Sequence, residues 1–506
     1  MTLLAPLLLA LLAAPLATLA GRLRPAWSAP VGGTAASLAF AAGLWSWTAG
    51  DNRLDLPWAP TWDLRLHLAL DGLALLYALL ATGIGLAVVV YAARYVPLHL
   101  EHQRRPAVEV VRFYGLLLLF MGAMVGLVMA QDLVLLFVFW DLTAIASYFL
   151  IGYDRQHAEA RAAALMAFLV TGITSIPLLL GALLLHARYG TFALPDLASR
   201  VEPDGYLAVA LGLMTVAALA KSAQVPFHFW LPRAMAAPTP VSAYLHSAAM
   251  VAAGVFLLQR LYPLLQRSDL LLDGLLAIGL LSMAVGGVLA LTRDVLKQLL
   301  AYSTIAQYGY VVVLLGLGGA AGVAGASYYV VAHALAKSAL FLTAGTVTEA
   351  TGQDRLSSLG GLRRPMPLLA AASGAAAAGL AGLPLTVGFF KDELFFKAAL
   401  ERGWPFAALA VVGAALTLAY TWRFWSGIFL GPSRAAARPL PAALVAPVVG
   451  LGLLVVAGGI VGGPFASLAE VAGEVALGAP TPIAAAYHLD RHARVDKHVL
   501  TWRQVR

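Results

Sequence analysis

The chain has 506 residues, of which 61% are hydrophobic and 11% are charged, and its mean hydropathy is +0.83. A soluble domain carries about 25% charged residues, so this composition excludes a soluble globular protein and indicates an integral membrane protein. The net charge of +8 requires no nucleic-acid partner, because excess arginine at the inner face of a membrane accounts for it, and the absence of cysteine excludes disulfides, thiolate-bound iron–sulfur clusters and cysteine zinc sites.

Apolar stretches long enough to cross a bilayer recur from Thr2 to about Val461. The first, Thr2 to Ala20, has no positive charge before it, so we expect a retained helix and not a cleaved signal peptide. Later spans are expected near 70–92, 113–130, 132–152, 162–186, 204–222, 242–264, 272–291, 298–317, 324–346, 366–390, 403–429 and 439–461. About fourteen helices fit this punctuation best, which predicts an all-α polytopic membrane protein.

Positive charges are distributed unevenly between alternate loops. Arg22 and Arg24 follow the first span, and with the N-terminus outside, the inner loops hold roughly twice as many basic residues as the outer loops. This bias predicts a multi-pass protein of a prokaryotic inner or plasma membrane with its N-terminus outside. Before the third span, residues 50–67 alternate in polarity and contain turn formers, which predicts a small hairpin over the outer mouth.

Two spans are interrupted in a similar way. One contains Lys221 followed by Pro226 and three further prolines, which preclude a regular helix. The other contains Ala381-Gly-Leu-Pro384 shortly before Lys391. Paired broken spans in two halves of a chain are typical of repeat-built transporters with a site near the midplane.

Three of the six lysines, Lys221, Lys337 and Lys391, lie within these apolar spans, and Asp141 lies within another. Ionisable groups at that depth are costly and by default mark an ion or proton path. Burial disfavours the charged form of Lys221, whereas a nearby carboxylate favours it, so a pair with Asp141 would switch protonation state. A static ion pair, or a bond from Asp141 to the hydroxyl of Thr143, is the structural alternative.

Histidines extend this polar line through later spans. His333 and Lys337 are four residues apart and share a helix face, so a proton can pass between them directly or through one water, and His246 lies in a span before them. Packing or helix-bonding roles are the alternative for each histidine.

Further candidates lie at the ends of the line. Asp392 and Glu393 follow Lys391 and are expected near water, as exit groups, helix caps or contacts to a neighbouring subunit. Lys297 begins a span at the inner face and is either part of the path or a snorkelling end residue, and His228 lies in the proline-rich break.

Four strings resemble one family: AKSAQVPFHFWLPRAMAAPTPVSAYLHSAAMVAAG (220–254), FWDLTAIASYFLIGY (139–153), LKQLLAYSTIAQYGY (296–310) and AHALAKSALFLTAG (332–345). They are similar to the proton-translocating antiporter-like subunits of respiratory complex I and of Mrp-type cation/proton antiporters. The segment MAAPTPVSAYLHSA looks most like the large MrpA-type subunit of Mrp antiporters, although Ala252 stands where that subunit commonly has a lysine.

The resemblance implies fourteen core helices that include two inverted five-helix repeats with broken seventh and twelfth helices. It places Asp141 at the fifth-helix acid, which is usually glutamate, Lys221 at the seventh-helix lysine and His246 at the eighth-helix histidine. His333 and Lys337 fall on eleventh-helix relay positions, and Lys391 falls on the twelfth-helix terminal lysine.

The predicted division is an N-terminal part with the hairpin (1–112), two five-helix repeats (113–264 and 265–431), and a last helix with a basic tail (432–506). The predicted function is a proton-translocating subunit of a multisubunit Mrp-type Na⁺(cation)/H⁺ antiporter, with other membrane subunits, lipid, H⁺ and Na⁺ as partners. No cofactor, bound metal, redox site or hydrolytic site is expected. The alternatives are a subunit of a complex I-like oxidoreductase or membrane hydrogenase, a proton-conducting subunit of an inorganic-carbon uptake complex, and a static membrane scaffold.

Overall fold

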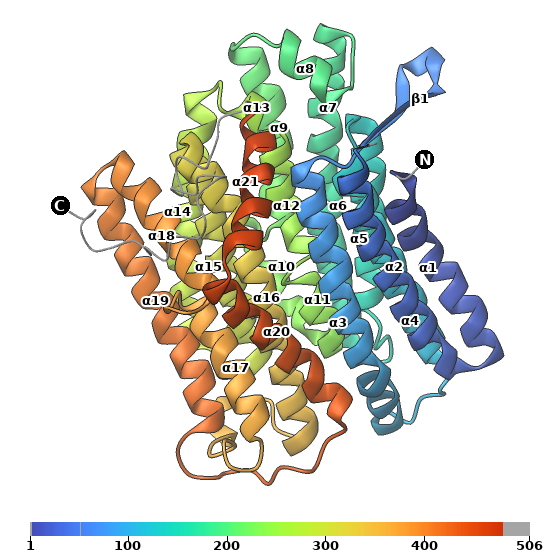
Figure 1. Cartoon of the computed structure of the whole chain (residues 1–506), viewed down its shortest axis with the longest axis vertical. Helices are drawn as coiled ribbons and strands as arrows, with labels where there is room; N and C mark the ends of the chain where they lie inside the picture. Colours follow the sequence, from blue (N-terminus) through green and yellow to red (C-terminus); the bar gives the residue numbers. More distant parts are fainter. Residues whose placement is uncertain (1–2, 51, 479–506) are drawn as a thin grey trace.

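The computed structural model describes residues 3–50 and 52–478, which form one elongated bundle of helices (Figure 1). Thr2 and the predicted basic tail from residue 479 onward lie outside the described residues. The all-α prediction is confirmed, since eleven helices among the described residues are long and apolar enough to cross a membrane. The count of fourteen spans and the two inverted repeats stay predictions.

The N-terminal part contains α1 (Leu4–Leu23), α2 (Ser28–Ala49) and α3 (Gly72–His102). Between α2 and α3, strands β1 (Arg53–Ala59) and β2 (Leu64–Ala69) pair antiparallel, with Leu56 opposite Leu66. The guanidinium of Arg65 binds the carboxylate of Asp55 through two hydrogen bonds of 2.7 and 2.8 Å. The predicted hairpin is therefore present, and it projects from one end of the bundle (Figure 1). The opposite end of the bundle is called the far end below.

The middle of the chain is divided into many short helices. They are α4 (Glu109–Met129), α5 (Leu133–Ile151), α6 (Ala158–Ile173), α7 (Ser175–Tyr189), α8 (Leu194–Arg200), α9 (Gly205–Lys221), α10 (Trp230–Arg233), α11 (Thr239–Leu245), α12 (Met250–Arg260) and α13 (Tyr262–Leu265). The remaining helices are α14 (Asp269–Thr292), α15 (Leu296–Leu317), α16 (Gly319–Thr351), α17 (Pro367–Leu380), α18 (Val387–Arg402), α19 (Trp404–Phe429), α20 (Ala442–Ile460) and α21 (Gly463–Leu477).

Both predicted breaks are present. Helix α9 ends at Lys221, and the turn that follows contains Ala223 in the left-handed region at φ 52°. Helix α17 ends at Leu380, and α18 begins only at Val387. Between them Gly382 has φ 72°, which favours glycine, and a Cβ there would lie 1.8 Å from the Asp392 carboxylate.

Two further breaks were not predicted. The span expected at 162–186 is divided at Thr174, because Pro177 has no N–H and its ring crowds the carbonyl of Ile173, where α6 ends. The span expected at 242–264 is interrupted between α11 and α12, over residues 246–249. There the Ser247 hydroxyl donates to the Ala243 carbonyl and competes with the helical hydrogen bond.

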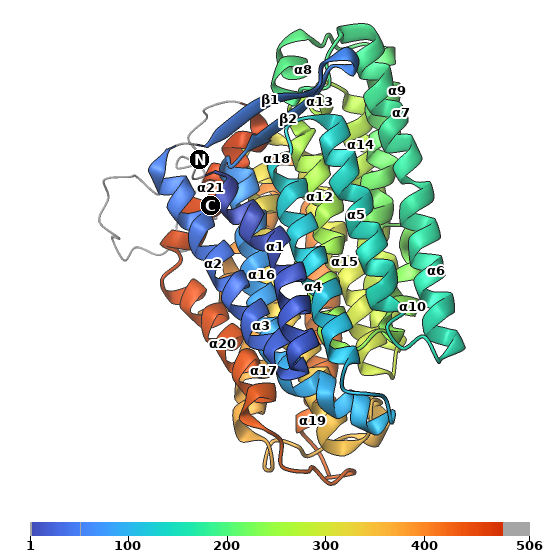
Figure 2. The ribbon, with the colours of Figure 1, turned by 90° about the vertical axis from the view of Figure 1, so that its right-hand side faces the viewer.

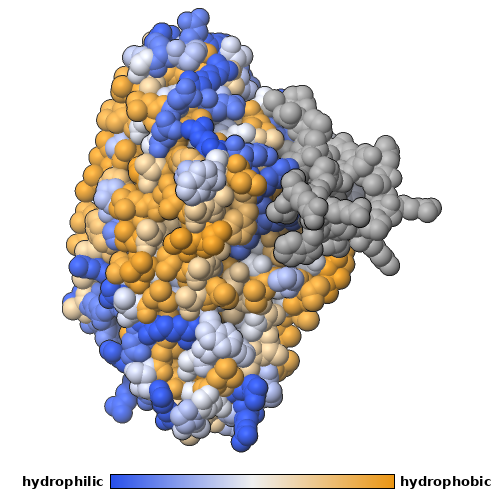
Figure 3. All heavy atoms as spheres, turned by 90° about the vertical axis from the view of Figure 1, so that its left-hand side faces the viewer, coloured by the Kyte–Doolittle hydropathy of each residue, from blue (hydrophilic) through white to orange (hydrophobic). Residues whose placement is uncertain are grey.

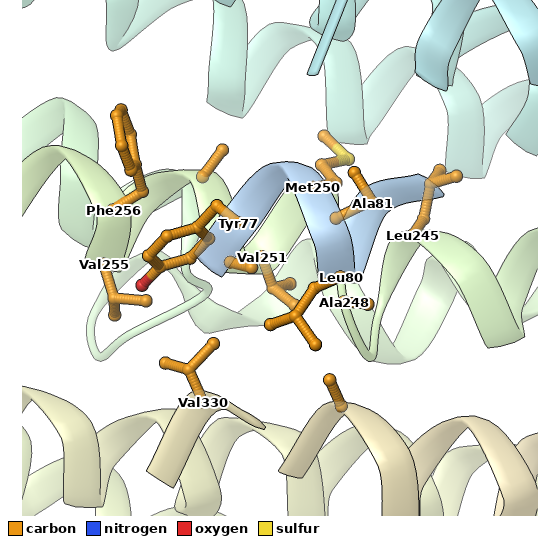
Figure 4. Packing of buried hydrophobic residues seen from close by; sticks show 14 of the residues in the cluster. Tyr77, Leu80, Ala81, Leu245, Ala248, Met250, Val251, Val255, Phe256 and Val330 are labelled. Atoms are coloured by element: carbon orange, nitrogen blue, oxygen red, sulfur yellow. The ribbon is translucent and has the colours of Figure 1, made fainter. Parts of the chain in front are cut away.

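The break between α11 and α12 lies in the packed centre of the bundle. Figure 4 shows side chains from α3, such as Tyr77 and Leu80, packed around it, with Val330 of the fully buried α16 on the other side. Elsewhere helices approach closely through glycine: a Cβ at Gly309 of α15 would lie 2.8 Å from the Met283 nitrogen of α14. These close contacts hold the centre of the protein in one arrangement.

The surface has the character expected for a lipid environment. Many large apolar side chains are exposed, among them Leu16, Leu19 and Val411. In Figure 3 a broad hydrophobic zone separates two ends at which hydrophilic residues gather. The protein is therefore a multi-pass membrane protein.

At the far end, the loop after α5 is tied to α3 and α4 by charged groups. The Asp154 carboxylate accepts hydrogen bonds from Arg105 Nη1 at 2.6 Å and His99 Nε2 at 2.9 Å. Burial alone would raise the pKa of Asp154, but the hydrogen bond and charge of His99 and the charge of Arg105 bring it below its ordinary value. This carboxylate therefore stabilises the fold when ionised.

Candidate functional site

Lys221, the last residue of α9, is fully buried against α5. Its Nζ donates hydrogen bonds to the Trp140 carbonyl at 2.8 Å and to the Thr143 hydroxyl at 2.6 Å. The ammonium also lies 4.0 Å from the centre of the Trp140 ring, a distance suited to a cation–π contact. Two oxygens and an aromatic face therefore hold the predicted central lysine.

Asp141 lies next to Trp140 in the chain but faces a different direction. Neighbouring side chains on a helix point about 100° apart, whereas Trp140 and Thr143 share a face. Asp141 lines a pocket of about 270 Å³ near the α6–α7 break, together with Ser175 and exposed apolar side chains such as Ile173. The expected ion pair is thus absent: in the described part of the chain no contact within 4.0 Å joins Asp141 to Lys221, although their charges still attract.

The bond considered between Asp141 and Thr143 is not formed either. The Thr143 hydroxyl donates to the Trp140 carbonyl at 2.7 Å and accepts from Lys221. Oδ1 of Asp141 has no hydrogen-bond partner among the described residues. The acid is therefore placed to bind a group that approaches through its pocket.

His246, His333 and Lys337 meet in the centre of the bundle. His246 lies at the α11–α12 break, and His333 lies beside its backbone, with the Tyr308 ring 4.8 Å from the His333 ring. All four ring nitrogens of the two buried histidines lack a hydrogen-bond partner among the described residues. Lys337 is fully buried and donates to the Ser303 hydroxyl.

Unpartnered imidazole nitrogens can accept or release a proton without first breaking a hydrogen bond. The α11–α12 break also frees backbone groups: the Tyr308 hydroxyl donates to the Ser247 carbonyl at 3.1 Å, and the hydroxyls of Ser247 and Ser338 are 2.6 Å apart. The unpredicted break therefore brings polar atoms between α12, α15 and α16.

Lys391, on α18, forms the ion pair that Lys221 lacks. Its Nζ is 2.6 Å from Asp392 Oδ1 and 4.6 Å from the centre of the Tyr329 ring. The Lys391 side chain is 1% exposed and that of Asp392 is 14% exposed, so the expectation of Asp392 near water is corrected: this carboxylate turns into the protein. Glu393 is half-buried and interacts with the charge of Lys397.

Sequence reasoning missed a polar network beside Lys391. Gln307 donates to the hydroxyls of Tyr420 at 2.8 Å and Thr417 at 3.3 Å, and its carbonyl oxygen accepts from Tyr329 at 2.9 Å. The hydroxyl of Tyr310 is 3.1 Å from that of Thr417. A detectable signal was the placement of Ser303, Thr304 and Gln307 three or four residues apart on one apolar helix.

The remaining candidates lie near the α9–α11 break. Lys297 Nζ donates to the Ala237 carbonyl at 2.8 Å, and its charge acts on His246. It therefore binds backbone inside the protein, in place of the snorkelling considered from the sequence. His228 is half-buried, with an unpartnered Nδ1.

Known proteins share this architecture. Residues 130–417 match the family model described as "NADH:quinone oxidoreductase/Mrp antiporter, TM". A Rhizobium meliloti (strain 1021) protein, named as the A/B subunit of a probable K(+)/H(+) antiporter, is 38% identical over 403 residues, 77% of this chain and 39% of the relative. The "Putative antiporter subunit mnhA2" of Staphylococcus aureus (strain JH9) is 36% identical over 365 residues, 69% of this chain and 45% of the relative.

Two solved complexes contain similar chains. One, from the Mrp complex of Dietzia sp. DQ12-45-1b, has a TM-score of 0.85 and 35% identity, covering 95% of this chain and 53% of that chain. The other, from the archaeal membrane-bound sulfane sulfur reductase, shares the fold with a TM-score of 0.82 and 23% identity, covering 93% of this chain and 97% of that chain. This chain spans less than half the length of the two antiporter relatives. The match over more than half of its residues shows that the chain belongs to the NADH:quinone oxidoreductase/Mrp antiporter transmembrane family.

Proposed function

We propose that this chain is a proton-translocating membrane subunit of a multisubunit Mrp-type cation/proton antiporter. The observation that carries the proposal is the convergence of buried lysines with two histidines whose ring nitrogens have no hydrogen-bond partner among the described residues. Such groups are expensive within a membrane and are retained where an ion or proton moves. The identity to relatives named as antiporter subunits supports this function over others in the family.

The proposed path begins at Asp141 and Lys221, continues through His246, His333 and Lys337, and ends at Lys391. Lys297, His228, Asp392 and Glu393 are proposed entry or exit groups. When protonated, Lys221 is stabilised by the Trp140 carbonyl and the Thr143 hydroxyl; when neutral, it avoids the cost of a buried charge. A change at Asp141 shifts the balance between these states through charge attraction.

We further propose that neighbouring membrane subunits complete the site. The Asp141 pocket opens at the surface of the bundle, so a cationic group on a neighbouring subunit could reach the carboxylate. The similar Dietzia chain comes from an Mrp complex, which supports such an assembly. Na⁺ or K⁺ exchange would take place at sites outside this chain's relay.

The chain is proposed to lie in a prokaryotic inner or plasma membrane with its N-terminus outside. The far end, where Arg22, Arg105 and Arg112 lie, would then face the cytoplasm, as expected from the charge bias. We also retain the division into residues 1–112, 113–264, 265–431 and 432–506 as a proposal.

The test is proton flux in vesicles that contain the native complex, driven in turn by Na⁺, K⁺, a redox substrate and bicarbonate. Lys221→Met should abolish flux while the complex stays assembled, and Lys221→Arg should retain part of it. Arg402→Gln is the matched control, because this cation pairs with Asp273 at the surface. Full flux with Lys221→Met would instead support a static scaffold, and flux driven only by a redox substrate or bicarbonate would support the other complexes.

A further inference from the structure

We infer that a groove between α1 and α4 binds an anionic phospholipid. The groove has a volume of about 470 Å³ and lies on the outer side of these two helices, near the far end. Its walls are mostly apolar and include Pro15 and Leu19 of α1 and Leu119 of α4, whereas Arg22 and Arg112 supply its charges. Figure 2 shows α1 and α4 side by side on this face of the bundle.

The groove follows from local sequence. Pro15 interrupts the hydrogen bonding of α1, and Thr18 returns its hydroxyl to the Ala14 carbonyl at 2.7 Å. Opposite Thr18, α4 has Gly115, where a Cβ would lie 2.8 Å from the Thr18 hydroxyl oxygen. A small residue on the floor and larger apolar residues on the rims give a channel that runs along the helices.

The charged end of the groove has more positive than negative groups. Nη1 of Arg112 is buried without a hydrogen-bond partner among the described residues, and it is 3.6 Å from Glu109 Oε2. Glu109 already accepts hydrogen bonds from Arg105 at 2.9 Å and Arg155 at 3.1 Å. The local balance is four cations, Arg22, Arg105, Arg112 and Arg155, against the two carboxylates of Glu109 and Asp154.

This combination fits a lipid better than a soluble anion. The Leu19 side chain is 57% exposed and continues the apolar wall, which suits an acyl chain and has no use for free phosphate. A guanidinium pairs with phosphate oxygens through two parallel hydrogen bonds, and basic pockets between membrane helices bind anionic head groups. Excess positive charge disfavours the ammonium of a zwitterionic lipid, so the groove should select an anionic one.

The experiment places the full-length chain in nanodiscs of phosphatidylcholine with a minor fraction of phosphatidylglycerol, and native mass spectrometry identifies the lipids retained. We expect phosphatidylglycerol to be enriched, and each of Arg22→Gln and Arg112→Gln to reduce its retention about fivefold, as a charge worth about 1 kcal/mol would. Arg24→Gln is the matched control: Arg24 is exposed and packs on Trp27 outside the groove, so retention should not change.

The double variants keep the inference testable if folding is affected. Arg22→Lys with Arg112→Lys preserves the charge and should retain phosphatidylglycerol, whereas the double glutamine variant should not. Equal retention by wild type and the double glutamine variant would overturn the inference, as would equal enrichment of phosphatidylcholine. Photocrosslinking from position 19 in native membranes should capture lipid, and capture of a protein subunit would also overturn it.

Discussion

The Lys391–Asp392 pair offers a direct test of what holds a relay lysine in place. Asp392→Asn leaves the ammonium, which is 1% exposed, without the carboxylate 2.6 Å away. Removing one partner of a buried ion pair costs about 3–5 kcal/mol, and because the Asp392 side chain is 14% exposed, we expect the lower end of that range. Lys391 then either loses its proton or is displaced from the Tyr329 ring, and either result interrupts transport.

Thermal unfolding in a fixed lipid mixture and proton flux in vesicles measure the two effects separately. Asp392→Asn should lower both, whereas Lys391→Met combined with Asp392→Leu should restore thermal stability but not flux, because apolar replacement of a whole buried pair is often neutral. Arg402→Gln breaks an exposed pair and should change stability by about 0–1 kcal/mol. Unchanged stability and flux in Asp392→Asn would refute this reasoning.

Three other predictions concern separate parts of the molecule. Thr143→Val removes a hydroxyl that accepts from Lys221 at 2.6 Å, so the charged lysine loses about 1.5–3 kcal/mol of stabilisation and flux should fall, as vesicle assays would show; unchanged flux would contradict this role. Because the pKa of Asp154 lies below its ordinary value, its stabilisation is present above about pH 4 and lost as pH falls through the folded-state pKa, so Asp154→Asn should flatten the acid limb of a stability curve. Gly309→Leu should destabilise the bundle by about 1–3 kcal/mol or more in denaturation, because a Cβ would lie 2.8 Å from the Met283 nitrogen, whereas Gly450→Leu, with open space around its Cβ position, should not.

The fold was predictable where covalent geometry dictates it. Prolines after Lys221 and at position 384 remove backbone donors, so both breaks could be located from the sequence. The break at residues 246–249 contains no proline, and it depends on a serine hydroxyl that competes for a helical carbonyl. Serine occurs in many unbroken membrane helices, so the outcome depends on tertiary partners such as the Tyr308 hydroxyl.

The site was predictable as a set of residues but not as a set of bonds. Composition alone marks Lys221 and Asp141 as costly within a membrane, whereas their pairing depends on the rotation of α5. The structure turns Trp140 and Thr143 toward the lysine and Asp141 toward the surface pocket. The network around Gln307 escaped notice because neutral side chains have no scarcity signal in an apolar chain.

The three buried lysines are held in different ways, which has a consequence for the proposed relay. Lys391 has a carboxylate, Lys221 has two oxygens and a ring, and the hydrogen bond identified for Lys337 is to the neutral Ser303 hydroxyl. A charge is stabilised least beside a neutral hydroxyl, so a proton on Lys337 should be the least stable state along the path. Ser303→Ala should therefore slow flux without disassembling the complex. A Ser303→Ala variant with unchanged flux would place the barrier elsewhere on the path.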